Sequence, residues 1–214
     1  MESNKRVTEN KPLTRSVDSL QKIYAVIIGL AIARTTQEVV QGTNWNEILP
    51  RIQATAPALL SFFFLIVPFY HGMNRHLDYS YLERVPQHSK IGLIMDFIFF
   101  SLEAALFFLF ADTIILGKES FIVIALILGL DILWGTFATL LNYHKESGKQ
   151  NPFAWVKINI VTLIFGFFIY VYGDNPVIDV RWCLAVLLVG RTIIDYYMMM
   201  DFYFPEEPQA PTGT

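Results

Sequence analysis

Charged residues are scarce in this sequence, and a single cysteine is present. Asp, Glu, Lys and Arg make up 16% of the 214 residues, whereas soluble domains contain about 25%. Cys183 has no second cysteine to bond with, which excludes an intrachain disulfide. The 16 Lys and Arg do not outnumber the 19 Asp and Glu, so the chain lacks the basic footprint of a nucleic-acid-binding protein. We therefore expect neither a disulfide-stabilised fold nor a nucleic-acid partner.

Motifs for cofactors and metals are also missing. The tract Gly117-Lys118-Glu119-Ser120 lacks the upstream glycine of a nucleotide-binding loop, and no His-Glu-x-x-His zinc motif occurs. We expect no cofactor and no bound metal, and we favour a protein that is not an enzyme.

Apolar residues dominate what is present. They account for 54% of the chain, and the 18 phenylalanines cluster in runs such as Phe62-Phe63-Phe64. Such runs leave no polar side to face water, which is typical of helices in contact with lipid. The sequence thus predicts an all-α, polytopic helical bundle in a cell membrane, either the plasma or the inner membrane. Its main partner would be the lipid bilayer, and we also expect it to self-associate.

Six segments are predicted to span the membrane, with both termini in the cytoplasm. We expect a polar tail over 1–15, a six-helix transmembrane domain over 16–204 and a disordered acidic tail over 205–214. With six spans, eleven Lys and Arg lie on the side of the termini and three on the other side, which marks the first side as cytoplasmic. The six predicted spans are 18–40, 52–71, 91–111, 121–143, 153–172 and 182–204.

The first span has the weakest apolar signal. Its uninterrupted apolar run, 23–33, is shorter than the ~20 residues that a bilayer needs. If it did not span, the Lys and Arg bias would fall to eight against six, so the charge pattern supports it as a span. Ala25, Gly29 and Ala33 lie on one face of this helix, a pattern that lets helices approach closely. We therefore expect an interior helix.

Five charged residues lie deep inside the later apolar spans, at least five residues from either end of a span: Asp96, Glu103, Asp131, Arg191 and Asp195. A charge at the centre of an inserted helix costs roughly 2.5–3.5 kcal/mol, so these residues must have partners inside the bundle. A rise of about 1.5 Å per residue puts Glu103, Asp131 and Arg191 at one level near the membrane centre. The same count puts Asp96 and Asp195 together nearer the cytoplasm. We expect Arg191 to pair with Glu103 or Asp131, and Asp96 to lie beside Asp195.

This network contains more acid than base. Four carboxylates face Arg191, and the other arginine within a span, Arg34, lies nearer the outer face. A low-dielectric interior does not hold uncompensated carboxylates, so some of them must be protonated or bind a cation. The sequence therefore predicts a protein that conducts or couples cations or protons. The alternative is a structural or accessory membrane subunit whose buried ion pairs only hold the bundle together.

A polar stretch, 71–90, follows the second span and is expected to be an aqueous loop on the cytoplasmic side. It contains His71, Arg75 and His76, and His144 follows the fourth span at the same level. We expect these residues to form an interfacial cluster that meets lipid headgroups. A third hypothesis is a lipid-modifying membrane enzyme that uses these histidines together with Asp78.

Overall fold

The computed structural model describes residues 11–40, 44–83, 90–113, 119–140, 152–173 and 179–205. Every regular element within these residues is a helix. In chain order the elements are α1 (Lys11–Val40), α2 (Trp45–Leu77), the π-helical segment η1 (Asp78–Glu83), α3 (Lys90–Thr113), α4 (Ser120–Leu140), α5 (Pro152–Tyr172), α6 (Val180–Met198) and α7 (Met200–Tyr203).

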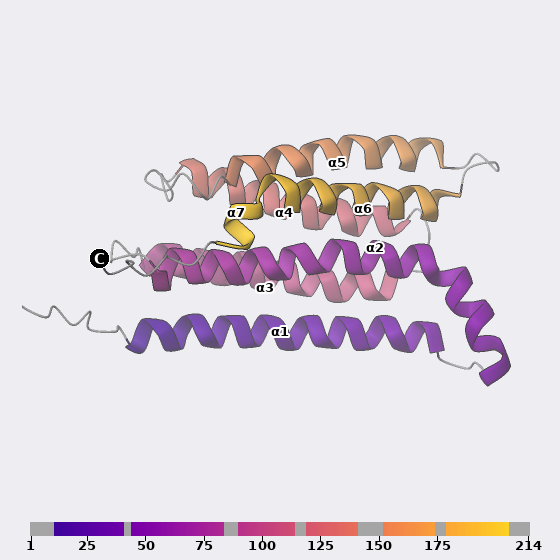
Figure 1. The fold of residues 1–214 in the computed structure, drawn as a ribbon, viewed down its shortest axis with the longest axis horizontal. Helices are drawn as coiled ribbons and strands as arrows, with labels where there is room; N and C mark the ends of the chain where they lie inside the picture. Colours follow the sequence, from indigo (N-terminus) through magenta and orange to yellow (C-terminus); the bar gives the residue numbers. More distant parts are fainter. Residues whose placement is uncertain are drawn as a thin grey trace, which may run out of the picture.

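The six long helices α1 to α6 lie side by side and alternate in direction (Figure 1). Helix α1 packs on α2 and α3, α3 packs on α4, α4 on α5, α5 on α6, and α6 on α2. These contacts form a closed ring of helices around a common interior. Because the directions alternate, the start of α1 and the end of α6 lie at the same end of the bundle.

Five helices in the described part of the chain are long and apolar enough to cross a membrane, in agreement with a multi-pass helical membrane protein. They cover Pro12–Glu38, Asn46–Glu83, Ile91–Thr113, Ser120–Leu140 and Phe153–Tyr172. Helix α6 is not one of the five, and it carries Arg181, Arg191 and Asp195. The predicted bounds of the third and fifth spans differ from those of α3 and α5 by two residues or fewer. Helix α1 begins at Lys11, inside the segment expected as a tail.

The prediction of an aqueous loop over 71–90 is wrong as far as Glu83. Helix α2 does not end near His71 but continues to Leu77, and η1 extends the helical path to Glu83. An apolar stripe on one face explains this, because burial at every fourth residue keeps the chain helical against the core. The buried residues of this stripe are Phe69, Met73, Leu77 and Tyr81.

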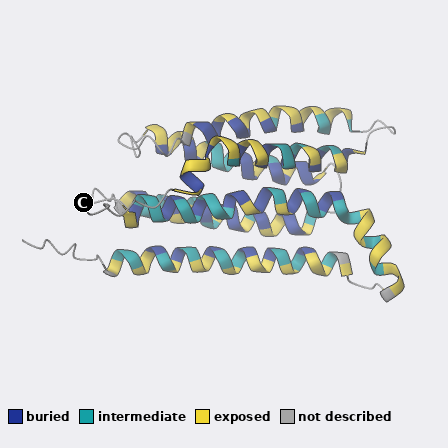
Figure 2. Cartoon of the chain, viewed as in Figure 1, coloured by how far each residue is buried: buried dark blue, intermediate teal, exposed yellow. Residues whose placement is uncertain are grey.

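The interior position expected for the first helix is also wrong. Gly29 and Ala33 are exposed, and no described atom lies within 4 Å of a methyl group added at Gly29. Exposed positions run along the whole length of α1 (Figure 2). A stripe of larger residues faces α2 and α3 instead, since it buries more apolar surface than the small residues could. The buried positions of α1 are Val17, Leu20, Tyr24, Ile28, Ala31 and Thr35.

The last predicted helix is interrupted near its end. Helix α6 stops at Met198, Met199 has a non-helical backbone, and the single turn of α7 folds back toward α2 (Figure 1). Phe202 and Tyr203 are buried by this turn. Burial of two aromatic side chains outweighs the continuation of the helix, and Pro205 follows at a point where it cannot extend a helix.

Two polar contacts help to define α6. At its start, the Asp179 side chain accepts a hydrogen bond from the backbone N–H of Arg181 at 3.0 Å, as a helix N-cap does. Burial alone would raise the pKa of the Asp179 carboxyl, but its hydrogen bonds with Arg181 outweigh burial and lower the pKa. Further along, the Thr192 hydroxyl donates to the carbonyl of Phe64. That carbonyl has no helical donor because Pro68, four residues later, lacks an N–H.

Gly166 lets α5 approach α4 closely, and its replacement by alanine is expected to destabilise the protein. The added methyl carbon would lie 2.3 Å from Cε2 of Phe121, a buried ring on α4. We expect Gly166→Ala to lower the free energy of unfolding by about 1–3 kcal/mol, because the ring must shift in a packed interface. Unfolding in mixed micelles with increasing SDS measures the change.

Gly129→Ala on α4 is the matched control for this substitution. No described atom lies within 4 Å of a methyl group at Gly129, and the better helix propensity of alanine should stabilise the protein by up to about 1 kcal/mol. Equal stability of the two variants would contradict the close packing of α4 on α5.

Candidate functional site

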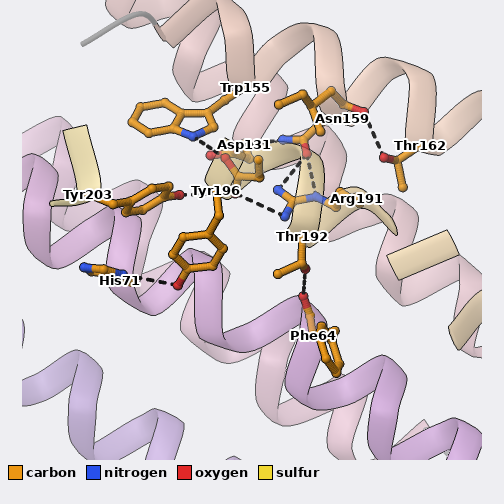
Figure 3. Close-up of polar contacts among 12 residues, drawn as sticks. Phe64, His71, Asp131, Trp155, Asn159, Thr162, Arg191, Thr192, Tyr196 and Tyr203 are labelled. Atoms are coloured by element: carbon orange, nitrogen blue, oxygen red, sulfur yellow. Dashed lines mark hydrogen bonds and ion pairs between the residues drawn. The ribbon is translucent and has the colours of Figure 1, made fainter. Parts of the chain in front are cut away.

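Arg191 is the centre of a buried polar network between α5 and α6 (Figure 3). Its Nε and Nη2 both donate to Oδ1 of Asn159, at 3.0 and 2.8 Å. Its Nη1 lies 3.6 Å from Oδ2 of Asp195, one helical turn further on. The guanidinium also lies over the ring of Phe69, 4.7 Å from the ring centroid. The Arg191 side chain thus contacts residues of α5, α6 and α2.

Asn159 connects the arginine to Asp131. While its Oδ1 accepts from Arg191, its Nδ2 donates to Oδ2 of Asp131 at 2.5 Å. The expected direct pairing of Arg191 with Glu103 or Asp131 is therefore wrong. The amide stands between the arginine and Asp131, and the ion pair forms within α6, where a spacing of four residues places both side chains on one face.

Both oxygens of Asp195 have neutral donors as well. Nε1 of Trp155 donates to Oδ1 at 3.0 Å, and the Tyr203 hydroxyl donates to Oδ2 at 3.1 Å. Asp195 is only 1% exposed. With Arg191 beside it, this carboxylate has the partners that a buried charge requires.

Asp96 forms a second, separate cluster near the opposite side of the ring of helices. It accepts from Nε1 of Trp134 at 2.9 Å and from the Tyr81 hydroxyl at 2.7 Å, and it lies 3.0 Å from Nε2 of His76. The expectation that Asp96 lies beside Asp195 is wrong, because each has its own partners. The two clusters meet where the ring of Trp134 packs on that of Trp155, with centroids 6.2 Å apart.

Glu103 and Asp131 differ from the other two acids. Glu103 accepts a hydrogen bond from the Tyr24 hydroxyl at 3.1 Å, and Asp131 accepts the one from Asn159. Within the described residues, neither carboxylate forms an ion pair with a basic side chain. Glu103 is buried, and Asp131 is partly buried.

A central cavity brings these residues together. Its volume, taken as the space open to a water-sized molecule, is about 30 Å³. Its polar lining comes from Glu103, Asp131, Arg191, Asp195 and His76, and its apolar lining is largely aromatic. A second, smaller cavity of about 10 Å³ also borders Glu103 and Asp131. The two carboxylates that lack a basic partner therefore lie between two cavities.

Helix α7 closes one end of the central cavity. Tyr203 lines the cavity and packs closely on Gly72, where a methyl group would lie 3.3 Å from the tyrosine hydroxyl oxygen. Nε of Arg75 donates to the carbonyl of Phe202 at 2.8 Å, and the same arginine pairs with Glu83 through both terminal nitrogens. Arg75 thus anchors α7 rather than facing lipid headgroups.

The expected interfacial histidine cluster does not form among the described residues. His76 is buried against Asp96, whereas His71 lies 3.2 Å from the hydroxyl of Tyr196. Asp78, proposed as their catalytic partner, accepts from Gln21 at 2.9 Å. His144 lies outside the described residues. The enzyme hypothesis therefore finds no convergence of His71, His76 and Asp78.

Arg34 lies apart from the network. It contacts Asp112 at 2.5 Å and Glu38 at 2.7 Å, and about a third of its side chain is exposed. His76 is instead the second basic group near the buried acids.

The partners of the charged residues are mostly neutral side chains that our sequence analysis missed. Asn159 carried a usable signal, because it is an amide in the middle of an apolar span. Tyr24, Trp155 and Tyr203 carried none, since aromatic residues are frequent throughout this chain. Within the described residues, no three His, Cys, Asp or Glu side chains gather in a metal-binding cluster.

Comparisons with known proteins add no further assignment. No family model, no curated protein and no solved structure matches this chain.

Proposed function

We propose that this chain is a six-span membrane protein with cytoplasmic termini that conducts or couples protons or small cations through Glu103 and Asp131. The observation that carries the proposal is the position of these two carboxylates. They face a shared cavity, accept hydrogen bonds from neutral donors and form no ion pair with any basic side chain in the described part of the chain. Two such charges are not stable together in a low-dielectric interior, so the pair is expected to bind a proton or a cation.

The length of α6 and its outward-facing side chains support it as the sixth span, although it carries charged residues. Its 19 residues measure about 28 Å at 1.5 Å per residue, close to the hydrocarbon thickness of about 30 Å. Arg191 and Asp195 are buried, whereas Val186, Ile193 and Ile194 are exposed. The outward side of α6 is thus suited to lipid. With six spans, the Lys and Arg excess on the side of the termini assigns that side to the cytoplasm.

Flux through proteoliposomes tests the proposal. We expect the double variant Glu103→Gln with Asp131→Asn to abolish proton and cation flux, because neither amide can take up a proton or compensate a cation. Both replacements keep the shape of the side chain and one acceptor oxygen for the donors Tyr24 and Asn159, so the folded structure should be retained. Size-exclusion chromatography and thermal unfolding check this.

Asp112→Asn is the matched control for the flux measurement. This carboxylate lies on α3 like Glu103, but it pairs with Arg34 and is 38% exposed. Its replacement should leave flux unchanged. Flux that survives in the folded double variant would overturn the conduction proposal.

The second candidate is a structural or accessory subunit. It is favoured by the complete set of partners around Asp96 and Asp195, which resembles a network that fixes geometry. This candidate predicts no specific flux in the native protein. Self-association and the choice of membrane also stay predictions, which cross-linking and cell fractionation would check.

A further inference from the structure

One nitrogen of Arg191 points to what the central cavity holds. Nη1 is the only buried side-chain nitrogen or oxygen in the described residues without a hydrogen-bond partner. The arginine is only 4% exposed and lines the same cavity as Glu103 and Asp131. A buried donor of this kind needs an acceptor, and where protein atoms do not supply one, ordered water usually does.

From this we infer that the species carried at the Glu103–Asp131 site is the proton, passed through water that bridges Arg191 and the two carboxylates, and not a metal cation. The inference rests on the proposed function and narrows its substrate. A water molecule can accept from Nη1 and donate to a carboxylate at the same time. It therefore offers an acceptor to Nη1, which has the 3.6 Å ion-pair contact with Asp195 but no hydrogen bond, and a donor to the two carboxylates, which accept one hydrogen bond each.

A metal cation fits this lining poorly. Hard cations require several oxygen ligands, six or more for Ca²⁺ and near-octahedral coordination for Mg²⁺. In the part of the chain that the structure describes, no three acidic, histidine or cysteine side chains gather around one point. The guanidinium of Arg191 faces the same space and would repel a cation, and the remaining wall is largely aromatic.

The transfer itself needs no other reactant. A hydronium ion from one aqueous side protonates the carboxylate of Glu103 and leaves a water molecule. Glu103 then gives its proton to the bridging water, while that water gives another of its protons to Asp131. Asp131 releases the proton to water in the second cavity, so that one proton moves and no bond other than O–H changes.

Charged and titratable groups surround this pair from several helices. Tyr24 on α1 bonds Glu103 directly, and His76 on α2 lines the central cavity. Arg191 and Asp195 face it from α6, and Tyr203 faces it from α7. The ion pair within α6 is electrically neutral overall. A proton on Glu103 or Asp131 therefore reduces the negative charge of the cavity without requiring a counter-ion from solvent.

The experiment separates the proton from metal cations. The full-length protein is placed in vesicles with a trapped pH-sensitive dye, and a pH gradient drives proton entry. Valinomycin with low, equal potassium on both sides serves as the charge shunt. Proton entry is compared in sodium medium and in N-methylglucamine medium. Uptake of radioactive sodium and rubidium is measured in parallel in vesicles without valinomycin, because valinomycin itself carries rubidium.

We expect proton entry at the same rate in both media and tracer uptake no greater than in protein-free vesicles. The Glu103→Gln, Asp131→Asn double variant should lose the proton entry. Tracer uptake that this variant abolishes, with proton entry absent when sodium is replaced, would overturn the inference but leave the proposed function standing. Absence of every flux in the native protein would overturn the proposed function itself.

Discussion

Replacing Arg191 with leucine is expected to lower the free energy of unfolding by about 3–5 kcal/mol, because it leaves a buried carboxylate without its cation. Asp195 would keep only the neutral donors Trp155 and Tyr203. Asn159 would also lose both donors to its Oδ1, so a buried acceptor would be unsatisfied. Unfolding of the purified protein in mixed micelles with increasing SDS measures the loss.

Arg181→Leu is the matched control for this prediction. Arg181 lies on the same helix and pairs with Asp179, but the two side chains are 46% and 43% exposed. Exposed pairs contribute between about 0 and 1 kcal/mol, so this variant should be close to the native protein. A loss for Arg191→Leu no larger than that for Arg181→Leu would contradict the structural role of the buried network.

A double variant separates the charge from the packing. If Asp195 is replaced by leucine together with Arg191, the uncompensated carboxylate disappears. We expect the double variant to be more stable than the sum of the two single losses predicts, because neighbouring members of one network are not additive. Strict additivity would show that the 3.6 Å pair does not couple the two residues.

The sequence predicted helices where the apolar signal was uniform. The spans of α3 and α5 are strongly apolar along most of their length, and their bounds are close to the predicted ones. The continuation of α2 past His71 was missed, because charged residues in that stretch concealed an apolar stripe at every fourth position. The break at Met199 was missed because it depends on where Phe202 and Tyr203 can be buried, which is a property of the tertiary structure.

The charged residues of the site could be predicted from the sequence because charges are rare in apolar helices. Their pairing could not be predicted, because counting residues along a helix gives the height of a residue in the bundle but not the direction of its side chain. Arg191 lies near the predicted level of Asp131, yet Asn159 stands between them. A neutral amide adds no charge to the count, so the connection through Asn159 is visible only in the packed structure.

Replacing Asp96 with leucine is expected to lower the free energy of unfolding by a similar amount, about 3–5 kcal/mol, because three buried donors lose one shared acceptor. The indole N–H of Trp134, the hydroxyl of Tyr81 and the Nε2 of His76 all meet this carboxylate. Asp96→Asn should lose less, since its amide retains one acceptor oxygen for these donors. SDS-induced unfolding of both variants measures the difference.

Asp112→Leu is the control on the same helix, because that carboxylate is 38% exposed in its pair with Arg34 and should contribute at most about 1 kcal/mol. A loss of stability for Asp96→Leu as small as that of the control would show that the three donors find other partners.

Flux measured in the folded fraction of Asp96→Asn then tests whether the two clusters act separately. Because Asp96 does not line the central cavity, flux per folded molecule should be retained, whereas the Glu103 and Asp131 variants should lose it. Loss of flux in folded Asp96→Asn would extend the pathway to the His76 cluster and remove the distinction between structural and proton-carrying acids.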